Sequence, residues 1–268
     1  MGLPSVADNL CAPFLNGGII STVPHRLFLD LETFGHTSIK NGAHRYAEDA
    51  EVMLVAWAWD DQPVQVWDTQ DVGDWRAELQ EGIDSADEIV IHNSAFDRTV
   101  LHHCGVNVPV DKIVDTMVIA LQHSLPGSLG MLCDILGVPT DKAKDKDGKK
   151  LINLFTKARP KNVKLRRATR ETHPDEWQRF IEYARLDVDA MRSVLGRLPR
   201  WNCTVSEREL WLLDQGVNDR GVAVDTELAQ SALRAFERAT RSLAARAGKL
   251  TGGAVSAATQ RDAVLKHL

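Results

Sequence analysis

The sequence predicts an α/β fold in which a central mixed β-sheet is flanked by helices. Short apolar runs typical of buried strands come first and are mostly adjacent along the chain, and helical patterns dominate afterwards. This order favours a mixed sheet over alternating parallel units. The 268 residues are 44% hydrophobic, which is enough for one large domain, or one domain and part of another, with a substantial core.

Apolar runs, candidate helix caps and turn residues predict the individual helices and strands. Ser94 and Ser128 are candidate helix caps, Gly105 and Gly137 candidate helix ends, and Pro174 falls in the first turn of a long helix. Strands are expected at 26–35, 50–60, 64–68 and 88–93, and helices at 72–83, 94–105, 115–123, 128–136, 149–158, 173–198, 206–217, 226–248 and from about 256.

Three segments follow from this pattern. Residues 1–25 are irregular and rich in proline and glycine, residues 26–200 form the main domain, and residues 201–268 begin a further helical region. No run approaches a membrane span, and the first residues lack the features of a secretory signal. The four cysteines are widely scattered, which favours a reducing cytoplasm and predicts no metal or redox motif.

The charge is unevenly distributed. The chain carries a formal net charge of −5, yet residues 141–170 hold twelve Lys or Arg against three Asp, a local charge of +9. Such a segment either contacts a polyanion or forms a solvated loop, and composition alone leaves both interpretations open.

Two acids end the first strand. Asp30 and Glu32 are two residues apart, so both side chains leave the same face of the strand. An acid-x-acid pair occurs by chance several times in a chain this acidic, so the pair is weak evidence by itself. Its position at the end of a buried strand, where α/β sheets place ligands, strengthens it.

Two further groups follow. In "IVIHNSAFDR", a strand ends at His92 and Asn93, and Asp97 lies one turn inside the next helix. The alternative for Asn93 is a turn or capping residue. The alternative for Asp97 is a first-turn acid that favours the helix dipole. In "IEYARLDVDAM", Tyr183 and Asp187 share a helix face at i and i+4; the alternative is a core tyrosine beside a surface acid. Asp189 faces elsewhere.

Together these groups supply four carboxylates, from Asp30, Glu32, Asp97 and Asp187. Oxygen-only ligation suits Mg²⁺ or Mn²⁺ rather than zinc, and two such ions bound close together serve phosphodiester hydrolysis. A tyrosine hydroxyl nearby could orient the attacking water.

In order and spacing, the three groups resemble the motifs of the proofreading 3′–5′ exonuclease superfamily: Asp30-x-Glu32, Asn93-x-x-x-Phe96-Asp97 and Tyr183-x-x-x-Asp187, the last placing it in the tyrosine subclass. The stretches "VDTMVIALQHSLPGSLGMLCDILGV" and "ELWLLDQGVNDRGVAVD" are similar to phage family A DNA polymerases, so the resemblance covers about residues 26–268. It implies the ribonuclease-H-like exonuclease fold over 26–200 and the start of a polymerase domain over 201–268.

The resemblance also implies roles. Asp30, Glu32, Asp97 and Asp187 would bind two Mg²⁺ or Mn²⁺ ions, and Tyr183 and Glu32 would position water. Thr33, Phe34, Asn93 and Phe96 would contact substrate, although Phe34 is equally expected in the core and Asn93 equally as a brace. The basic segment becomes a candidate contact for single-stranded DNA or a frayed primer 3′ end.

The resemblance has one large departure, because the downstream catalytic motifs of family A polymerases are absent. The chain is expected to be the exonuclease part of a truncated or divided polymerase, working in a bacterial cytoplasm if phage-encoded, with the polymerase part in a longer chain or a separate subunit. The alternatives are an RNA exonuclease of ribonuclease D type and a non-catalytic nucleic-acid-binding module.

Overall fold

A computed structural model describes residues 23–139, 142–159, 167–257 and 259–268, without side chains for 142–147. Nearly all of the irregular segment expected at 1–25 therefore lies outside the described residues. The chain divides into two compact units, the first ending at Gln215 and the second running from Gly216 to Leu268.

The first unit is built on a five-stranded mixed sheet with the strand order β3-β2-β1-β4-β5. Strand β1 pairs antiparallel with β2 and parallel with β4, while β3 is antiparallel to β2 and β5 is parallel to β4. The register between β1 and β2 shifts between Glu32 and Thr33, at the end of the acid pair. The predicted mixed sheet is therefore confirmed.

The expected elements are present with small changes at their ends. The strands are β1 (Arg26–Phe34), β2 (Glu51–Trp59), β3 (Gln65–Asp68), β4 (Glu88–Ile91) and β5 (Ile113–Asp115). The helices are α1 (Ala43–Ala47), α2 (Trp75–Ser85), α3 (Ser94–His103), α4 (Thr116–Gln122), α5 (Leu129–Leu136), α6 (Lys142–Phe155), α7 (Pro174–Leu195), α8 (Val205–Arg220), α9 (Thr226–Leu250) and α10 (Arg261–His267), with 3₁₀ turns at Ile39–Asn41 and Val110–Lys112.

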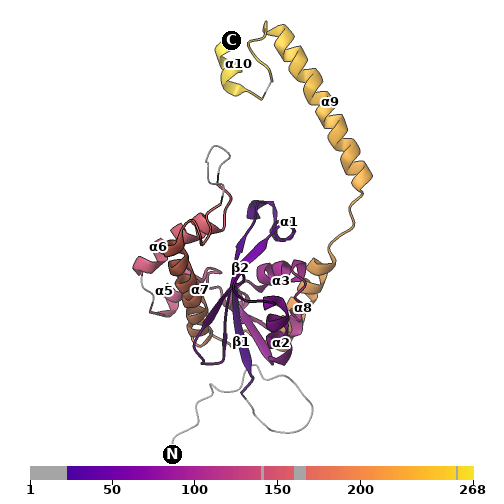
Figure 1. Cartoon of the computed structure of the whole chain (residues 1–268). Coiled ribbons are helices and arrows are strands. Elements are labelled where there is room, and N and C mark those ends of the chain that lie inside the picture. The colour runs from indigo at the N-terminus through magenta and orange to yellow at the C-terminus, as the bar shows by residue number, and fades with distance from the viewer. Residues whose placement is uncertain (1–22, 140–141, 160–166, 258) are drawn as a thin grey trace, which may run out of the picture. The chain divides into compact units, whose positions relative to one another are not determined.

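Helices cover both faces of the sheet (Figure 1). On one face, residues of α4, α5, α6 and α7 pack with Phe28, Leu54 and Val90 of the strands. On the other face, residues of α1, α2 and α3 pack with Leu29 and Val55. This alternation along each strand follows from side chains pointing to opposite faces, and it places the even-numbered acids of β1 on the α7 side.

Two elements were not expected. Strand β5 is only three residues long, and helix α1 is only five, so neither offers enough periodicity to be recognised in a sequence. Helix α6 is longer than expected, because it begins at Lys142 inside the basic segment. No disulfide joins the three cysteines of the described part, Cys104, Cys133 and Cys203.

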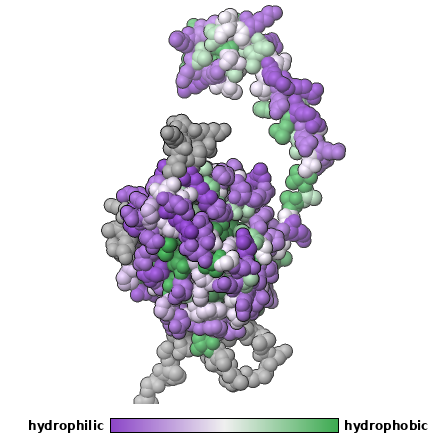
Figure 2. Space-filling model, in the orientation of Figure 1, coloured by the Kyte–Doolittle hydropathy of each residue, from purple (hydrophilic) through white to green (hydrophobic). Residues whose placement is uncertain are grey.

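The second unit contains α9, α10 and the last residues of α8. Apolar side chains lie exposed along α9, where they alternate with hydrophilic ones at the surface (Figure 2). Its large exposed apolar residues are Leu228, Leu233, Phe236, Leu243 and Leu250. In the described ranges, no helix combines the length and apolar character needed to cross a bilayer.

Candidate active site

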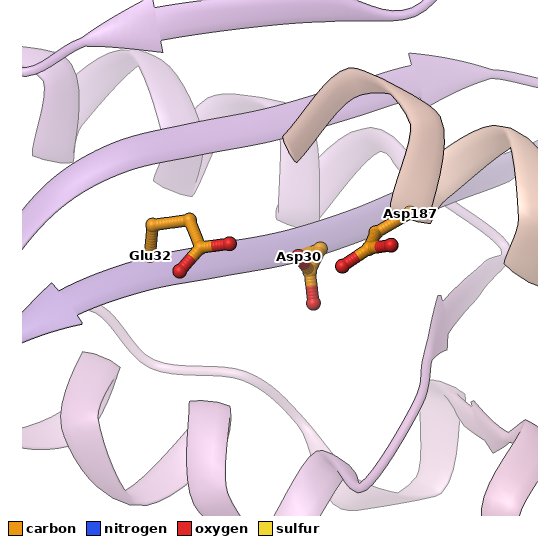
Figure 3. Close-up of side chains that lie close together, drawn as sticks. All are labelled: Asp30, Glu32 and Asp187. Carbon is orange, nitrogen blue, oxygen red and sulfur yellow. The ribbon is translucent and has the colours of Figure 1, made fainter. Parts of the chain in front are cut away.

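Three carboxylates meet above the middle of the sheet. Asp30 and Glu32 project from β1 and Asp187 from α7, and their carboxylates approach one another (Figure 3). One oxygen from each of the three lies within 4.8 Å of the others. Glu32 is only 8% exposed, although a charged side chain normally stays in water. The predicted convergence of Asp30, Glu32 and Asp187 is therefore present in the structure.

Helix α7 carries Asp187 to the sheet because one stripe of the helix is apolar. Trp177, Phe180, Ala184 and Val188 are buried at spacings of three and four residues, so this stripe lies in the core against the strands. Asp187 lies three residues after Ala184 and seven after Phe180, which places it at the edge of this stripe. Asp189, which was expected to face elsewhere, pairs with Arg185 at 2.6 Å.

Tyr183 lies one turn before Asp187 on α7. Its side chain is partly buried against the core, and its hydroxyl donates a hydrogen bond to the Asp187 carboxylate. Burial, followed by the negative charges of Asp187 and Glu32, raises the pKa of Tyr183 above its usual value. The hydroxyl therefore keeps its proton at neutral pH, and its oxygen can still accept one further hydrogen bond.

Asp97 lies in the first turn of α3 and is 3% exposed. It is outside the group of three carboxylates that meet within 4.8 Å. It is nevertheless close enough that the negative charge of Asp30 acts on it and its own charge acts on Glu32. Asp97 is thus coupled to the cluster by charge, and the four predicted acids form one electrostatic group.

The group is electrostatically strained without a cation. Burial and the neighbouring Asp187 raise the pKa of Asp30 to about 8. Burial, with the charges of Asp30, Asp187 and Asp97, raises the pKa of Glu32 well above its usual range. Burial, with the charges of Asp30 and Asp115, does the same to the pKa of Asp97. Each shift reflects acids held together where water cannot screen them.

Asp115, at the end of β5, was missed from the sequence. It is 5% exposed, and its carboxylate accepts hydrogen bonds from the backbone N–H groups of Asn93, Ser94, Met117 and Val118 at 2.7–3.2 Å. It therefore caps both α3 and α4. The signal that would have found it is an acid directly after a short apolar run, in "KIVDT".

The turn before α3 differs from the expectation that Ser94 caps the helix. Asn93 is the residue before the helix, in the left-handed conformation at φ 69°, and no side chain on it or Ser94 provides the cap. Asp115, which is distant in sequence, caps the start of α3 instead by accepting hydrogen bonds from the backbone N–H groups of Asn93 and Ser94. The Asn93 side chain is exposed, so both alternatives for it, substrate contact and brace, remain predictions.

His92 has a structural role, because both of its ring nitrogens are hydrogen-bonded to neighbouring elements. Its Nε2 lies 2.9 Å from the Gly127 carbonyl oxygen and its Nδ1 lies 2.8 Å from the Thr116 hydroxyl oxygen. Because a carbonyl can only accept, Nε2 carries the proton and Nδ1 accepts from Thr116. His92 ties β4 to α4 and to the loop before α5.

Two of the expected substrate residues surround Tyr46 of α1. The Thr33 hydroxyl is hydrogen-bonded to the Tyr46 hydroxyl at 2.8 Å, and Thr33 is 5% exposed. Phe96 is partly buried, with its ring centroid 5.6 Å from that of Tyr46. Both residues hold α1 against the sheet. Tyr46 was missed because its short helix was missed.

Phe34 is a core residue. It is 2% exposed, and the guanidinium of Arg167 lies 4.1 Å above its ring centroid. The Phe34 ring has no exposed face on which a terminal nucleotide could stack, so the expectation of stacking is corrected. The alternative, a core phenylalanine, is the one that the structure supports.

Two arginines of the basic segment 141–170 form ion pairs with acids of the first unit. Arg167 makes two hydrogen bonds to Glu51, at 2.7 and 2.8 Å. Arg170 bonds Asp68 at 3.1 Å and Asp71 at 2.7 Å. These two arginines fasten the chain before α7 to the sheet. The basic side chains within 141–147 and 160–166 lie outside the described residues, so the expected phosphate contact there stays a prediction.

The carboxylate cluster fits hard divalent cations. Its donors are oxygens only, which Mg²⁺ and Mn²⁺ prefer, and the described residues offer no cysteine or histidine in the same group. A bound cation would also relieve the repulsion that raises the pKa of Asp30. Asp30, Glu32 and Asp187 are the residues that would hold it, with Asp97 adjacent.

Comparison with known proteins shows a similarity to a phage DNA polymerase. No protein-family model matches the chain. The chain is similar to a DNA polymerase of Bacillus phage SP02, with 34% identity over 237 residues. The match covers 84% of this chain but 36% of that polymerase. The chain therefore spans about a third of the length of the curated relative it matches, and its similarity is to part of a phage DNA polymerase.

Proposed function

We propose that this chain is a metal-dependent 3′–5′ exonuclease that hydrolyses phosphodiester bonds at the 3′ end of DNA. Its place would be the proofreading part of a phage-type DNA polymerase, on a ribonuclease-H-like fold. The observation that carries the proposal is the meeting of Asp30, Glu32 and Asp187 within 4.8 Å on a mixed sheet. The similarity to a phage DNA polymerase supports DNA as the substrate class.

Asp30, Glu32 and Asp187, with Asp97 beside them, would hold two Mg²⁺ or Mn²⁺ ions. When bound, such ions activate water and stabilise the charge that develops on the phosphate. The chain's own groups would then position the reactants. The Tyr183 hydroxyl, which remains protonated, can hydrogen-bond the attacking water, and the Glu32 carboxylate can accept a hydrogen bond from it.

The proposal is tested with a 5′-labelled single-stranded DNA oligomer incubated with the protein in Mg²⁺, Mn²⁺ or EDTA. We expect a ladder that shortens from the 3′ end with either metal and intact DNA in EDTA. Asp30→Ala and Asp187→Ala should abolish the ladder. Asp189→Ala is the matched control, because this acid lies on the same helix but pairs with Arg185.

An RNA oligomer of the same sequence distinguishes the substrate. Faster digestion of RNA than of DNA would replace the proposed substrate with that of a ribonuclease D-type enzyme. Intact substrate in all lanes, from protein with a cooperative melting transition, would overturn the nuclease assignment in favour of a binding module.

A further inference from the structure

Helix α6 packs along α7 through one face that includes a glycine. Leu151 and Phe155 of α6 are buried, and the Phe155 ring stacks on Phe180 of α7 with centroids 5.1 Å apart. The Phe180 ring is in turn nearly parallel to the Tyr183 ring, at 6.4 Å and 7°. Gly148 lies seven residues before Phe155, so it is on the same face of α6 as these buried residues.

Gly148 is buried directly against the ring of Tyr183. A Cβ atom placed on Gly148 would lie 2.6 Å from Cδ2 of Tyr183 and closer still to Cε2. These distances are far inside van der Waals contact, so the ring edge occupies the space that any side chain at position 148 would need. The described helical glycines at 82, 130, 216 and 248 have no such neighbour within 3.4 Å.

The glycine is not explained by the backbone. Gly148 has no left-handed φ, and glycine disfavours the interior of a helix relative to alanine. The close approach of the two helices does explain it, because only a residue without Cβ lets the Tyr183 ring reach its present position. That position is the one in which the hydroxyl bonds Asp187.

We infer that Gly148 is a positioning residue. Because it has no side chain, the Tyr183 ring can pack directly against the α6 backbone, and this packing holds the Tyr183 hydroxyl within hydrogen-bonding distance of Asp187. The inference rests on the proposed nuclease function only for its consequence in catalysis. Gly148→Ala should displace the ring, and a displacement of about 1 Å at a positioned catalytic group can lower turnover by up to about 10²-fold.

The position of the Tyr183 ring can be tested independently of nuclease activity, by ¹⁹F NMR of protein labelled with 3-fluorotyrosine. The chain has two tyrosines, Tyr46 and Tyr183, so two resonances are expected, and Tyr183→Phe assigns them. Gly148→Ala should shift the Tyr183 resonance and leave that of Tyr46 in place. Gly130→Ala is the matched control, because this helical glycine has open space around its Cα. An unchanged Tyr183 resonance in Gly148→Ala would overturn the inference.

Turnover in a double-mutant cycle tests the consequence. Gly148→Ala should lower turnover in the parent protein but not further in Tyr183→Phe, since the hydroxyl it misplaces is already gone. Additive losses would show that Gly148 does not act through that hydroxyl. If Gly148→Ala melts too early to assay, adding Tyr183→Ala should restore its Tm by removing the ring. A wild-type protein without nuclease activity would refute the proposed function. The ¹⁹F result would still decide whether Gly148 positions the Tyr183 ring.

Discussion

The Tyr183 hydroxyl donates a hydrogen bond to the carboxylate of Asp187, one turn further along α7. One group is a protonated donor and the other belongs to the carboxylate cluster, so this single contact links the candidate water-positioning residue to the candidate metal ligands. The spacing i, i+4 makes the contact local, and the sequence alone predicted that the two side chains share a face of the helix.

Tyr183→Phe is expected to lower turnover while sparing metal binding. The ring and its packing against Phe180 remain, but the hydroxyl that would orient water is lost, and such proton-positioning groups contribute about 10²-fold or more. Turnover on labelled DNA and Mn²⁺ affinity by calorimetry measure the two effects. Equal turnover in the variant would remove Tyr183 from the mechanism.

Asp30→Ala and Asp187→Ala are expected to remove most of the nuclease activity without lowering the Tm of the metal-free protein. Each substitution removes one of several partly buried acids that repel one another, as the raised pKa of Asp30 indicates. Thermal melts in EDTA at pH 8 measure this. A Tm well below that of wild type would mean that these acids hold the fold together rather than oppose it.

The stability of the metal-free protein should fall as pH rises from about 4 to 8. Asp30 has a pKa of about 8 in the folded protein and 3.8 as its ordinary value, so within this window the folded state binds more protons than the unfolded state. Stability then decreases with increasing pH and levels off above pH 8. Melts in EDTA between pH 5 and pH 8 should show this slope, and Asp30→Asn should reduce it. A slope that is the same in Asp30→Asn would assign it to other groups.

Local patterns in the sequence predicted most of the site, and contacts between distant residues account for what they missed. Asp30, Glu32, Tyr183 and Asp187 follow the period of their own strand or helix, so their faces could be deduced. The capping role of Asp115 could not, because it depends on β5 lying beside β4 so that one carboxylate reaches two helix starts. Phe34 has an aromatic ring suited to stacking, but tertiary packing buries it.

Asp115→Ala is expected to lower the free energy of unfolding by about 2 kcal/mol or more, because it leaves buried N–H groups at the starts of α3 and α4 without an acceptor. Asp115→Asn should have a smaller effect, since the amide oxygen still accepts. Activity should also fall, because Asp97 lies in the first turn of α3. Urea denaturation measures the stability. The exposed neighbour Asp111 is the control, and Asp111→Ala should stay within about 0.5 kcal/mol of wild type.

Arg170→Ala is expected to destabilise the first unit, because it deprives a buried carboxylate of its cationic partner. Asp68 is 9% exposed and accepts from Arg170 at 3.1 Å and from the Trp177 indole N–H at 2.9 Å. The indole bond remains in the variant, so the loss should be partial, and Trp177→Phe in the same background should add to it. Arg179→Ala removes an exposed i, i+3 pair with Glu176 on the same helix and should change stability by less than about 1 kcal/mol. Similar losses for the two arginine variants would mean that the Asp68 contact does not anchor the start of α7, and with it the approach of Asp187 to the sheet.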